Sequence, residues 1–383
     1  MPAQTIRFGI IGLGLMGREF GSAAARWCHL LDLPFRPVIT GICDTNPALF
    51  GWFEAAFDTL RVKSTDYHDL LNSADIDAIY CAVPHNLHQQ MYIDIIEAGK
   101  HLLGEKPFGI DQAANDAILL AIARRPAVVV ACSSEFPFFP GAQRIIRFIN
   151  ENRFGQVIEV EAGLLHSSDL DPNKKINWKR MIEINGEYGC MGDLGLHPLH
   201  IPLRAGWMPT SVRAMLSNIV TERPNAAGER VPCRTWDNAT LCCDVQSAGQ
   251  AFPMYIKTYR IAPGETNTWY IRILGTHFSA EYSTKYPKTL RTMTYQSGGE
   301  QAWQSLDLGY DSAYPAITGG IFEFGFPDAI LQMWAAFCDQ LVNGRDHMHQ
   351  PFYCATPDET SRHHRLLTAA LESQRLGLVT SVL

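Results

Sequence analysis

The chain has 383 residues, of which 46% are hydrophobic and 19% are charged, and its formal net charge is −7. This length favours two domains over one. Its Lys and Arg residues are scattered without a basic run, which argues against a surface for nucleic acid or anionic membranes. No apolar run reaches the roughly 18 residues of a membrane-spanning helix, and we expect no signal peptide. Ten dispersed cysteines without a C-x-x-C pair favour reduced thiols in a cytoplasmic protein.

A glycine-rich motif follows the first predicted strand, Ile6–Ile11. Gly12, Gly14 and Gly17 have the spacing G-x-G-x-x-G and lead into the helix-compatible stretch Arg18–Trp27. In this motif the first glycine makes the turn, the second lets the backbone approach a pyrophosphate, and the third lets the helix pack on the strand. The phosphates then lie at the positive N-terminus of the helix. We therefore predict a dinucleotide site formed by Gly12, Gly14, Leu15, Met16 and Gly17.

The second predicted strand, Val38–Cys43, ends at an acid, Asp44. This acid lies somewhat beyond the usual distance of about 20 residues from the glycines. A carboxylate there can accept both hydroxyls of the adenosine ribose and would repel a 2′-phosphate, so NAD is favoured over NADP. The alternative is a structural role in which Asp44 caps the turn before Asn46-Pro47.

The first third of the chain continues to alternate strands and helices. The later strands are predicted at Ala78–Ala82, His101–Gly104 and Ala127–Cys132, and helices at Asn86–Ala98 and Gln112–Ala123. This alternation predicts a doubly wound parallel sheet, in which ligands bind at the carboxyl ends of the strands. The fourth of these strands ends in Glu105-Lys106-Pro107, and Lys106 there could shuttle a proton or polarise a substrate oxygen. The alternative is a surface lysine before a proline turn.

From about residue 133 the pattern changes to consecutive strands, which predicts an α+β unit with a mostly antiparallel sheet. The domains are therefore expected at 1–133 and 134–383. An open sheet face would be an apolar patch that self-association covers. The predicted elements are helices at Pro140–Glu151, Leu194–Ala205 and Pro357–Leu376, and strands at Val157–Leu165, Ser211–Ile219, Ala239–Val245, Phe252–Ile261, Trp269–Leu274, Phe278–Tyr282 and Arg291–Tyr295. The last helix is expected to pack back against the first domain.

A second set of polar residues lies at Asp193 and His197, which are four positions apart and share one face of a helix. The aspartate can fix the tautomer of the imidazole, and the histidine can take a hydroxyl proton. A structural helical pair is the alternative. Zinc on Asp193, His197 and His200 is not expected, because a closed site needs more ligands. Trp178 can stack on a sugar ring, and His166 and Lys179 can bond its hydroxyls; core packing for Trp178 is equally compatible.

Taken together, these motifs resemble the glucose–fructose oxidoreductase/inositol dehydrogenase (Gfo/Idh/MocA) family. The resemblance rests on Gly12–Gly17, Pro84–His88, Ala98–Pro107, Gly155–Glu159 and Gly189–His197. It implies a Rossmann domain followed by a domain with a large open sheet used in dimers or tetramers. It also implies that His197 is the general acid/base, Asp193 its partner, and Lys106 the group that binds the reacting hydroxyl. Residues expected to contact the nicotinamide end are Pro84, Asn86, His88, Glu105 and Lys106, and the Lys106–Pro107 peptide bond is expected to be cis.

The sequence departs from the family where the second domain begins. Relatives often carry Asn/Gln-Arg-Phe/Tyr there, whereas this chain has Glu135 within Ser133–Phe139, an acid in place of a base. We therefore expect an NAD-dependent dehydrogenase acting on a CH–OH group of a sugar, sugar derivative or polyol, without importing any relative's substrate. Two alternatives remain: a redox-neutral glycosidase or lyase with tightly bound NAD, and a non-catalytic nucleotide-binding regulator. Retained NAD without net NADH would favour the first.

Overall fold

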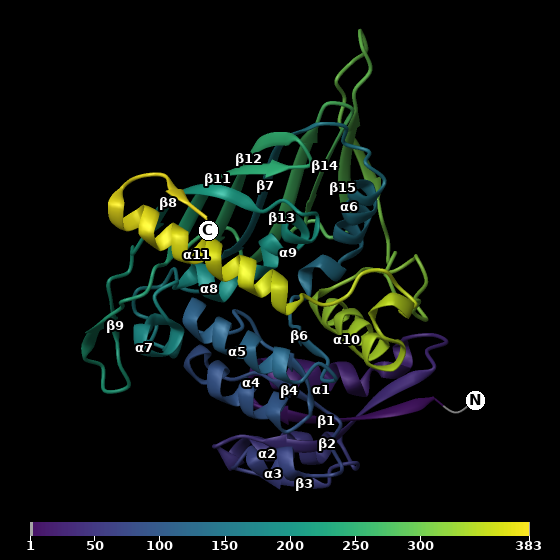
Figure 1. The fold of residues 1–383 in the computed structure, drawn as a ribbon, viewed down its shortest axis with the longest axis vertical. Helices are drawn as coiled ribbons and strands as arrows, with labels where there is room; N and C mark the ends of the chain where they lie inside the picture. The colour runs from purple at the N-terminus through teal and green to yellow at the C-terminus, as the bar shows by residue number, and fades with distance from the viewer. Residues whose placement is uncertain (1–2, 383) are drawn as a thin grey trace.

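The computed structural model describes residues 3–382, which form two sheets separated by a layer of helices (Figure 1). The first sheet is parallel, with the strand order β3-β2-β1-β4-β5-β6. Its elements are β1 (Gln4–Ile11), α1 (Leu15–Ala25), β2 (Phe35–Cys43), α2 (Phe50–Ala56), β3 (Val62–Ser64), α3 (His68–Asn72), β4 (Ala78–Cys81), α4 (His88–Glu97), β5 (His101–Gly104), α5 (Gln112–Arg124) and β6 (Val130–Cys132). This is the doubly wound Rossmann order that the alternating pattern predicts.

The second sheet has nine strands, in the order β16-β15-β14-β13-β7-β12-β11-β8-β17. Every neighbouring pair is antiparallel except β7 with β12. The strands are β7 (Val157–His166), β8 (Pro209–Ser217), β11 (Asn238–Ser247), β12 (Gln250–Tyr259), β13 (Asn267–Gly275), β14 (Phe278–Ser283), β15 (Thr289–Thr294), β16 (Gln304–Asp307) and β17 (Thr380–Ser381). β9 (Glu222–Pro224) and β10 (Arg230–Pro232) form a separate ribbon. The expected mostly antiparallel second sheet is confirmed.

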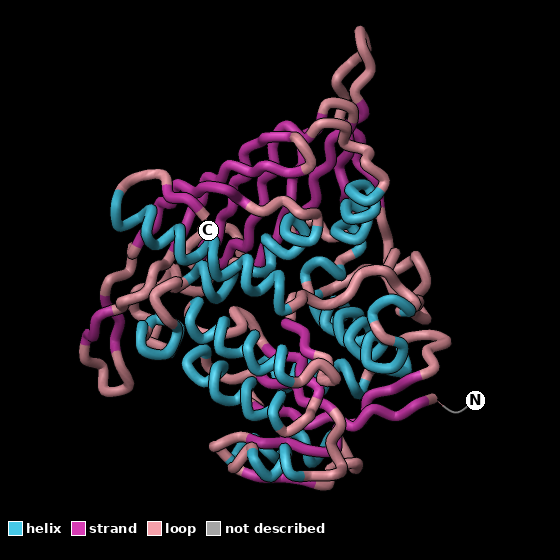
Figure 2. The backbone as a smooth tube through the Cα atoms, in the orientation of Figure 1, coloured by secondary structure: helices cyan, strands magenta, loops and turns pink. Residues whose placement is uncertain are grey.

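Helices cover one face of the nine-stranded sheet (Figure 2). They are α6 (Pro140–Asn150), α8 (Cys190–Leu194), α9 (Leu196–Arg204) and α11 (Pro357–Leu376). The remaining helices of this part of the chain are the short α7 (Ile182–Asn185) and α10 (Phe326–Asn343). Apolar residues alternate along the strands, so that in β12 Met254 and Ile256 are buried against the helices while Tyr255 and Lys257 lie on the outer face. None of the helices in the described part of the chain is long and apolar enough to cross a membrane.

Two helices from the C-terminal part of the chain pack against the first domain. α11 contacts α5, where Asn115 donates to Thr360 Oγ1 at 3.1 Å, so the expected return of the last helix is confirmed. α10, which the sequence patterns do not predict, packs on α1 and β2. Its Trp334 is fully buried, with its ring 5.2 Å from that of Phe8 and 3.6 Å from that of Phe20. One face of the Rossmann sheet is therefore completed by a helix that lies about 200 residues beyond it in the chain.

Candidate active site

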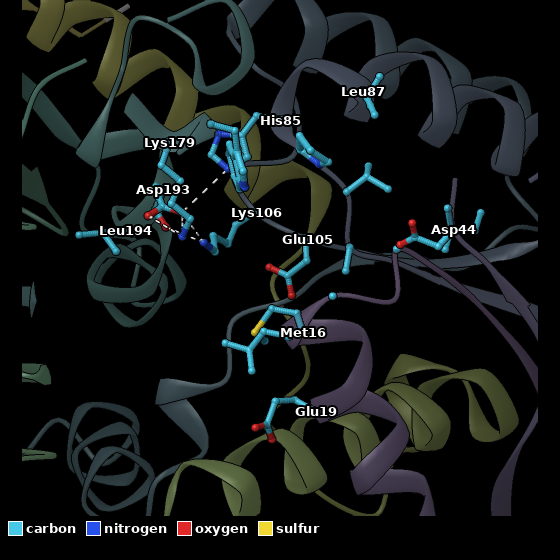
Figure 3. A pocket seen from close by; sticks show the side chains of 18 of the residues that line it. Met16, Glu19, Asp44, His85, Leu87, Glu105, Lys106, Lys179, Asp193 and Leu194 are labelled. Atoms are coloured by element: carbon cyan, nitrogen blue, oxygen red, sulfur yellow. Dashed lines mark hydrogen bonds and ion pairs between the residues drawn. The ribbon is translucent and has the colours of Figure 1, made fainter. Parts of the chain in front are cut away.

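A cleft with a volume of about 930 Å³ lies between the carboxyl ends of the Rossmann strands and the helices under the second sheet (Figure 3). The first domain contributes the loops after β1, β2, β4 and β5, and the second contributes the ends of β7 and β12 together with α8 and α9. Asp44 lies near one end of the view in Figure 3 and Asp193 near the other, with Glu105 between them.

The three glycines after β1 have different surroundings. Gly12 has φ +91°, and a Cβ there would lie 2.2 Å from the carbonyl oxygen of Ala82. A Cβ on Gly17 would lie 2.1 Å from the carbonyl oxygen of Gly12, whereas a Cβ on Gly14 would meet nothing within 4 Å. Gly14 is the N-cap of α1 and offers no side-chain cap, so the first amides of the helix face open space. This cradle fits a pyrophosphate at a helix N-terminus.

Asp44 organises the same loop. Its Oδ2 accepts from the backbone amide of Leu13 at 2.8 Å, and its Oδ1 accepts from that of Asn46 at 2.9 Å. The structural alternative for Asp44, a cap on the following turn, is thus present. The residue also lines the cleft beside the glycines, where the ribose site was expected. The structural role of Asp44 therefore leaves its carboxylate at the edge of the cleft, and its binding of a ribose stays a prediction.

At the other end of the cleft, three cations surround the buried carboxylate of Asp193. Lys106 Nζ lies 3.0 Å and Lys179 Nζ 3.2 Å from Oδ1, and Arg260 forms an ion pair with Oδ2. His85 approaches Oδ1 with Nε2 at 4.0 Å. Because these groups come from β4, β5, α8, β12 and the loop before α7, the carboxylate ties the two domains together at this point. The Lys106–Pro107 peptide bond is cis, as expected.

Burial changes the acidity of the cluster. It lowers the pKa of Lys106, and it lowers that of Lys179 strongly, with the nearby charges of Arg260 and Lys106 adding to the effect. Desolvation penalises an ammonium, and a neighbouring cation penalises it further. A lysine in this state gives up a proton more readily than a surface lysine, as a group that exchanges protons with a substrate requires.

His197 has different partners from those expected. Its Nδ1 lies 3.3 Å from Ser134 Oγ and 4.0 Å from Glu135 Oε2, and Phe136 packs edge-on against the ring. The expected pairing of His197 with Asp193 is wrong, because the carboxylate is drawn instead to the three cations. Burial lowers the pKa of His197 well below its ordinary value, so the imidazole is neutral at rest.

Two further carboxyl groups, Glu105 and Glu135, line the middle of the cleft. Glu105 accepts from the hydroxyl of Tyr80 at 2.7 Å. Burial, together with the charge of Glu105, raises the pKa of Glu135 to about 8. Glu135 therefore keeps its proton near neutral pH.

The residues predicted on the substrate side also line the cleft. His166 ends β7, and its Nδ1 contacts the carbonyl oxygen of Thr266 at 3.0 Å. Trp178 packs edge-on against His85 at 4.9 Å between ring centroids, and the ammonium of Lys179 lies 5.5 Å from the centroid of the Trp178 ring. Trp178 therefore combines packing with a surface exposed to the cleft.

Several residues expected near the nicotinamide or the substrate do not line the cleft. Asn86 is exposed, and His88 is buried with Nε2 3.0 Å from the carbonyl oxygen of Val83. Gly17, which was expected in the dinucleotide site, packs behind the glycine loop. Pro84, from the same loop as Asn86, does line the cleft.

Two further residues that line the cleft approach Asp193: Arg260, which was not predicted, and His85, which was predicted only as part of the Pro84–His88 loop. His85 directly follows Pro84, and its position after β4 placed it at the correct edge of the sheet. Arg260 follows Met254, Ile256 and Thr258 at intervals of two, so the alternation of β12 already assigned it to the inner face. Among residues 3–382, no group of three or more His, Cys, Asp or Glu side chains is arranged to hold a metal ion.

Comparison with known proteins agrees with this arrangement. Residues 6–133 match the model of the Gfo/Idh/MocA "Oxidoreductase family, NAD-binding Rossmann fold". A solved structure of levoglucosan dehydrogenase in complex with NADH and L-sorbose superimposes with a TM-score of 0.87 at 21% identity, covering 99% of each chain. At that identity the superposition establishes the fold.

Curated relatives include sugar and polyol dehydrogenases. Levoglucosan dehydrogenase of Pseudarthrobacter phenanthrenivorans is 26% identical over 226 residues, which cover 59% of this chain and 57% of that protein. Inositol 2-dehydrogenase/D-chiro-inositol 3-dehydrogenase of Lactiplantibacillus plantarum is 27% identical over 112 residues, covering 28% and 29% of the two chains. The alignments therefore span less than two thirds of either relative. The first domain of this chain, residues 6–133, therefore matches the NAD-binding Rossmann domain of the Gfo/Idh/MocA oxidoreductase family.

Proposed function

We propose that this protein is an NAD-dependent dehydrogenase that transfers a hydride between nicotinamide and a secondary or anomeric CH–OH group of a sugar, sugar derivative or polyol. One observation carries the proposal: Lys106 and His197 line the same cleft as the glycine loop, with Asp193 holding Lys106 in place. A nucleotide cradle at one end and a buried set of acid/base groups at the other is the arrangement that hydride transfer needs.

Separate residues of the chain bind the cofactor, orient the substrate and transfer the proton. The amides after Gly14 bind the pyrophosphate, and Asp44 binds the adenosine ribose, which favours NAD because a carboxylate repels a 2′-phosphate. When bound, the nicotinamide accepts or donates the hydride. Lys106 orients the reacting hydroxyl, and His197, neutral and free at Nε2, takes its proton. The apolar walls formed by Leu164, Trp178 and Phe326 exclude water around the reacting carbon.

The relatives' names suggest where the substrate search begins. Levoglucosan and the inositols are acted on by proteins of this family at 26% and 27% identity, which supports the carbohydrate class rather than one compound. The polar groups His166, Lys179 and Arg260 on the second-domain wall suit a polyhydroxylated molecule, because each can bond a hydroxyl.

The test is direct. The purified protein is mixed with NAD and, separately, with NADP, against a panel of sugars, anhydrosugars, sugar acids, glycosides and inositols, and NADH absorbance is followed. A rise with one class and NAD supports the proposal, provided that Lys106→Met abolishes it. Bound NAD recovered after purification, with product formed but no net NADH, would replace the proposal with redox-neutral chemistry.

We further propose that the protein is cytoplasmic and self-associates through the outer face of the nine-stranded sheet. The helices pack on the other face, and the outer face carries Met215 on β8, which is 53% exposed, and Tyr255 and Tyr259 on β12, with β11 between them. Light scattering with Met215→Lys as the variant tests this: a smaller particle than the wild type is expected, and an unchanged monomer in both would contradict it.

A further inference from the structure

Glu135 occupies the position where the sequence departs from its family, and it lies on the Nδ1 side of the His197 ring. The carboxyl group is buried, with a relative exposure of 4%, and Oε2 is 4.0 Å from Nδ1. The adjacent Ser134 Oγ lies 3.3 Å from the same nitrogen. Among the described residues Nε2 has no hydrogen-bond partner, and it lies across the ring from these groups. The imidazole is thus held from one edge and open at the other.

We propose that Glu135 is a positioning residue for His197: its carboxylate stabilises the imidazolium that forms when Nε2 takes the proton of the substrate hydroxyl. The inference rests on the proposed dehydrogenase function. In the step, the substrate O–H bond breaks, an N–H bond forms at Nε2, and the hydride leaves the same carbon for the nicotinamide. The Nδ1 proton stays on the ring and faces the carboxylate. This is the place that Asp193 was expected to fill.

The charge of Glu135 depends on its surroundings. It faces Tyr80 on β4, Glu105 and Lys106 at the end of β5, and His197 on α9. The residues next to Glu135 in the chain, Ser134, Phe136 and Pro137, contact Met333 and Phe326 of α10 and Gln143 of α6, none of which titrates. The other titratable groups around His197 are Lys106, His166, His200 and His363, all of which oppose a positive imidazole. Glu135 is therefore the acid placed to offset them.

This arrangement makes alcohol oxidation depend on pH. Burial and the charge of Glu105 raise the pKa of Glu135 to about 8. Below that pH the group is a neutral acid and supports the imidazolium weakly; above it the carboxylate supports it fully. The oxidation rate is therefore expected to rise through about pH 8, while the reverse reduction, which needs a protonated His197, shows no such gain.

Two measurements test the proposal with Glu135→Gln, which keeps the shape and cannot ionise, and with Glu151→Gln, an exposed control at the end of α6. The first is the 15N spectrum of the histidines between about pH 6 and about pH 10. The Nδ1 signal of His197 is assigned as the one that is missing in His197→Gln. We expect its chemical shift to change with pH, with a midpoint near 8, in the wild type and the control but not in Glu135→Gln. A signal that moves equally in Glu135→Gln overturns the proposal.

The second measurement is the pH profile of kcat on whichever compound the panel identifies. The wild type and Glu151→Gln are expected to gain activity through pH 8, and Glu135→Gln to show a flat profile with kcat about tenfold lower. Glu135→Asp, which retains an ionisable group, should restore the pH-dependent limb; a flat profile in the wild type would contradict the proposal. Because the 15N experiment needs no turnover, a panel without any substrate counts against the proposed function alone.

Discussion

Lys106 donates from Nζ to both the backbone carbonyl oxygen and Oδ1 of Asp193, at 2.7 and 3.0 Å. One ammonium thus joins the end of β5, in the nucleotide-binding domain, to the end of α8 under the second sheet. Since the same side chain faces the cleft, one contact both joins the two domains at this point and positions the proposed hydroxyl-binding group.

Replacing Lys106 with Met should separate these two roles. The methionine keeps much of the length but removes the charge, so kcat is expected to fall by about 10²–10⁴-fold. Lys179 and Arg260 still neutralise Asp193, so the melting temperature should change little. Steady-state kinetics and thermal denaturation measure the two effects, with Lys63→Met on the surface as the control. Near-normal turnover in the Lys106 variant would remove this residue from the mechanism.

The glycine loop offers a matched pair of substitutions. Gly12→Ala places a Cβ 2.2 Å from a backbone oxygen at a positive φ, so it should destabilise the fold by about 2–4 kcal/mol. Gly14→Ala meets no protein atom within 4 Å, so stability should be unchanged while NADH binding weakens at least about tenfold, or about 1.4 kcal/mol.

Denaturant unfolding and NADH fluorescence titration distinguish the two glycine variants. Gly51→Ala, in α2 and also without neighbours within 4 Å, is the control and should alter neither property. Wild-type affinity in Gly14→Ala would show that the phosphates do not approach this carbon.

Two variants of Asp44 test its double role. Asp44→Asn keeps an oxygen that can accept from the amide of Leu13 but loses the negative charge, so the preference for NADH over NADPH should narrow by about tenfold with stability maintained. Asp44→Ala should reduce the preference for NADH over NADPH in the same way. Because it also removes the acceptor for the amides of the loop, it should weaken the binding of both nucleotides. Dissociation constants for NADH and NADPH give the ratio. An unchanged ratio in both variants would leave Asp44 with the structural role alone.

Stability should also report on Glu135. Its pKa is raised from 4.5 to about 8 by burial first and by Glu105 second. Between these values the unfolded chain has lost a proton that the native state retains, so the free energy of unfolding falls as the pH rises from about 4.5 to about 8 and then levels off. In Glu135→Gln, which has no carboxyl group at this position, this decrease in the free energy of unfolding should be absent.

The melting temperature of Glu135→Gln should therefore be several degrees above that of the wild type at about pH 8. At about pH 5 the two melting temperatures should be close to each other. Thermal denaturation at a series of pH values measures the difference. A difference that does not grow with pH would mean that Glu135 ionises as an ordinary carboxyl group.

Local patterns predicted five of the six strands of the first sheet and the helices α1, α4 and α5, but not the short elements α2, β3 and α3. The signals that predicted these elements, alternating apolar residues and the glycines after β1, are each contained within a few residues. α10 was not predicted from the sequence, and the structure buries polar residues such as Gln332 and Asp339 in it together with the apolar ones, so its burial does not follow one apolar stripe.

The site was less accessible to such reasoning. Asp193 and His197 have helical spacing, but α8 ends at Leu194 and the decisive partners are distant in sequence. Lys106 is 87 residues from Asp193, and Ser134 is 63 residues from His197. Charged side chains that reach Asp193 from separate elements determine its contacts more than the histidine four residues away does. Because these side chains are far apart in the sequence, the sequence alone does not show which of them meet.

The covering of the Rossmann sheet by α10 has a consequence during synthesis. Chains are made from the N-terminus at about 5–20 residues per second, and domains generally fold as they emerge. Here Phe8 and Phe20 lack their cover until Trp334 has been made. The nucleotide-binding half can complete its core only when nearly the whole polypeptide is present, so a truncated product that lacks α10 should neither hold a dinucleotide nor escape proteolysis.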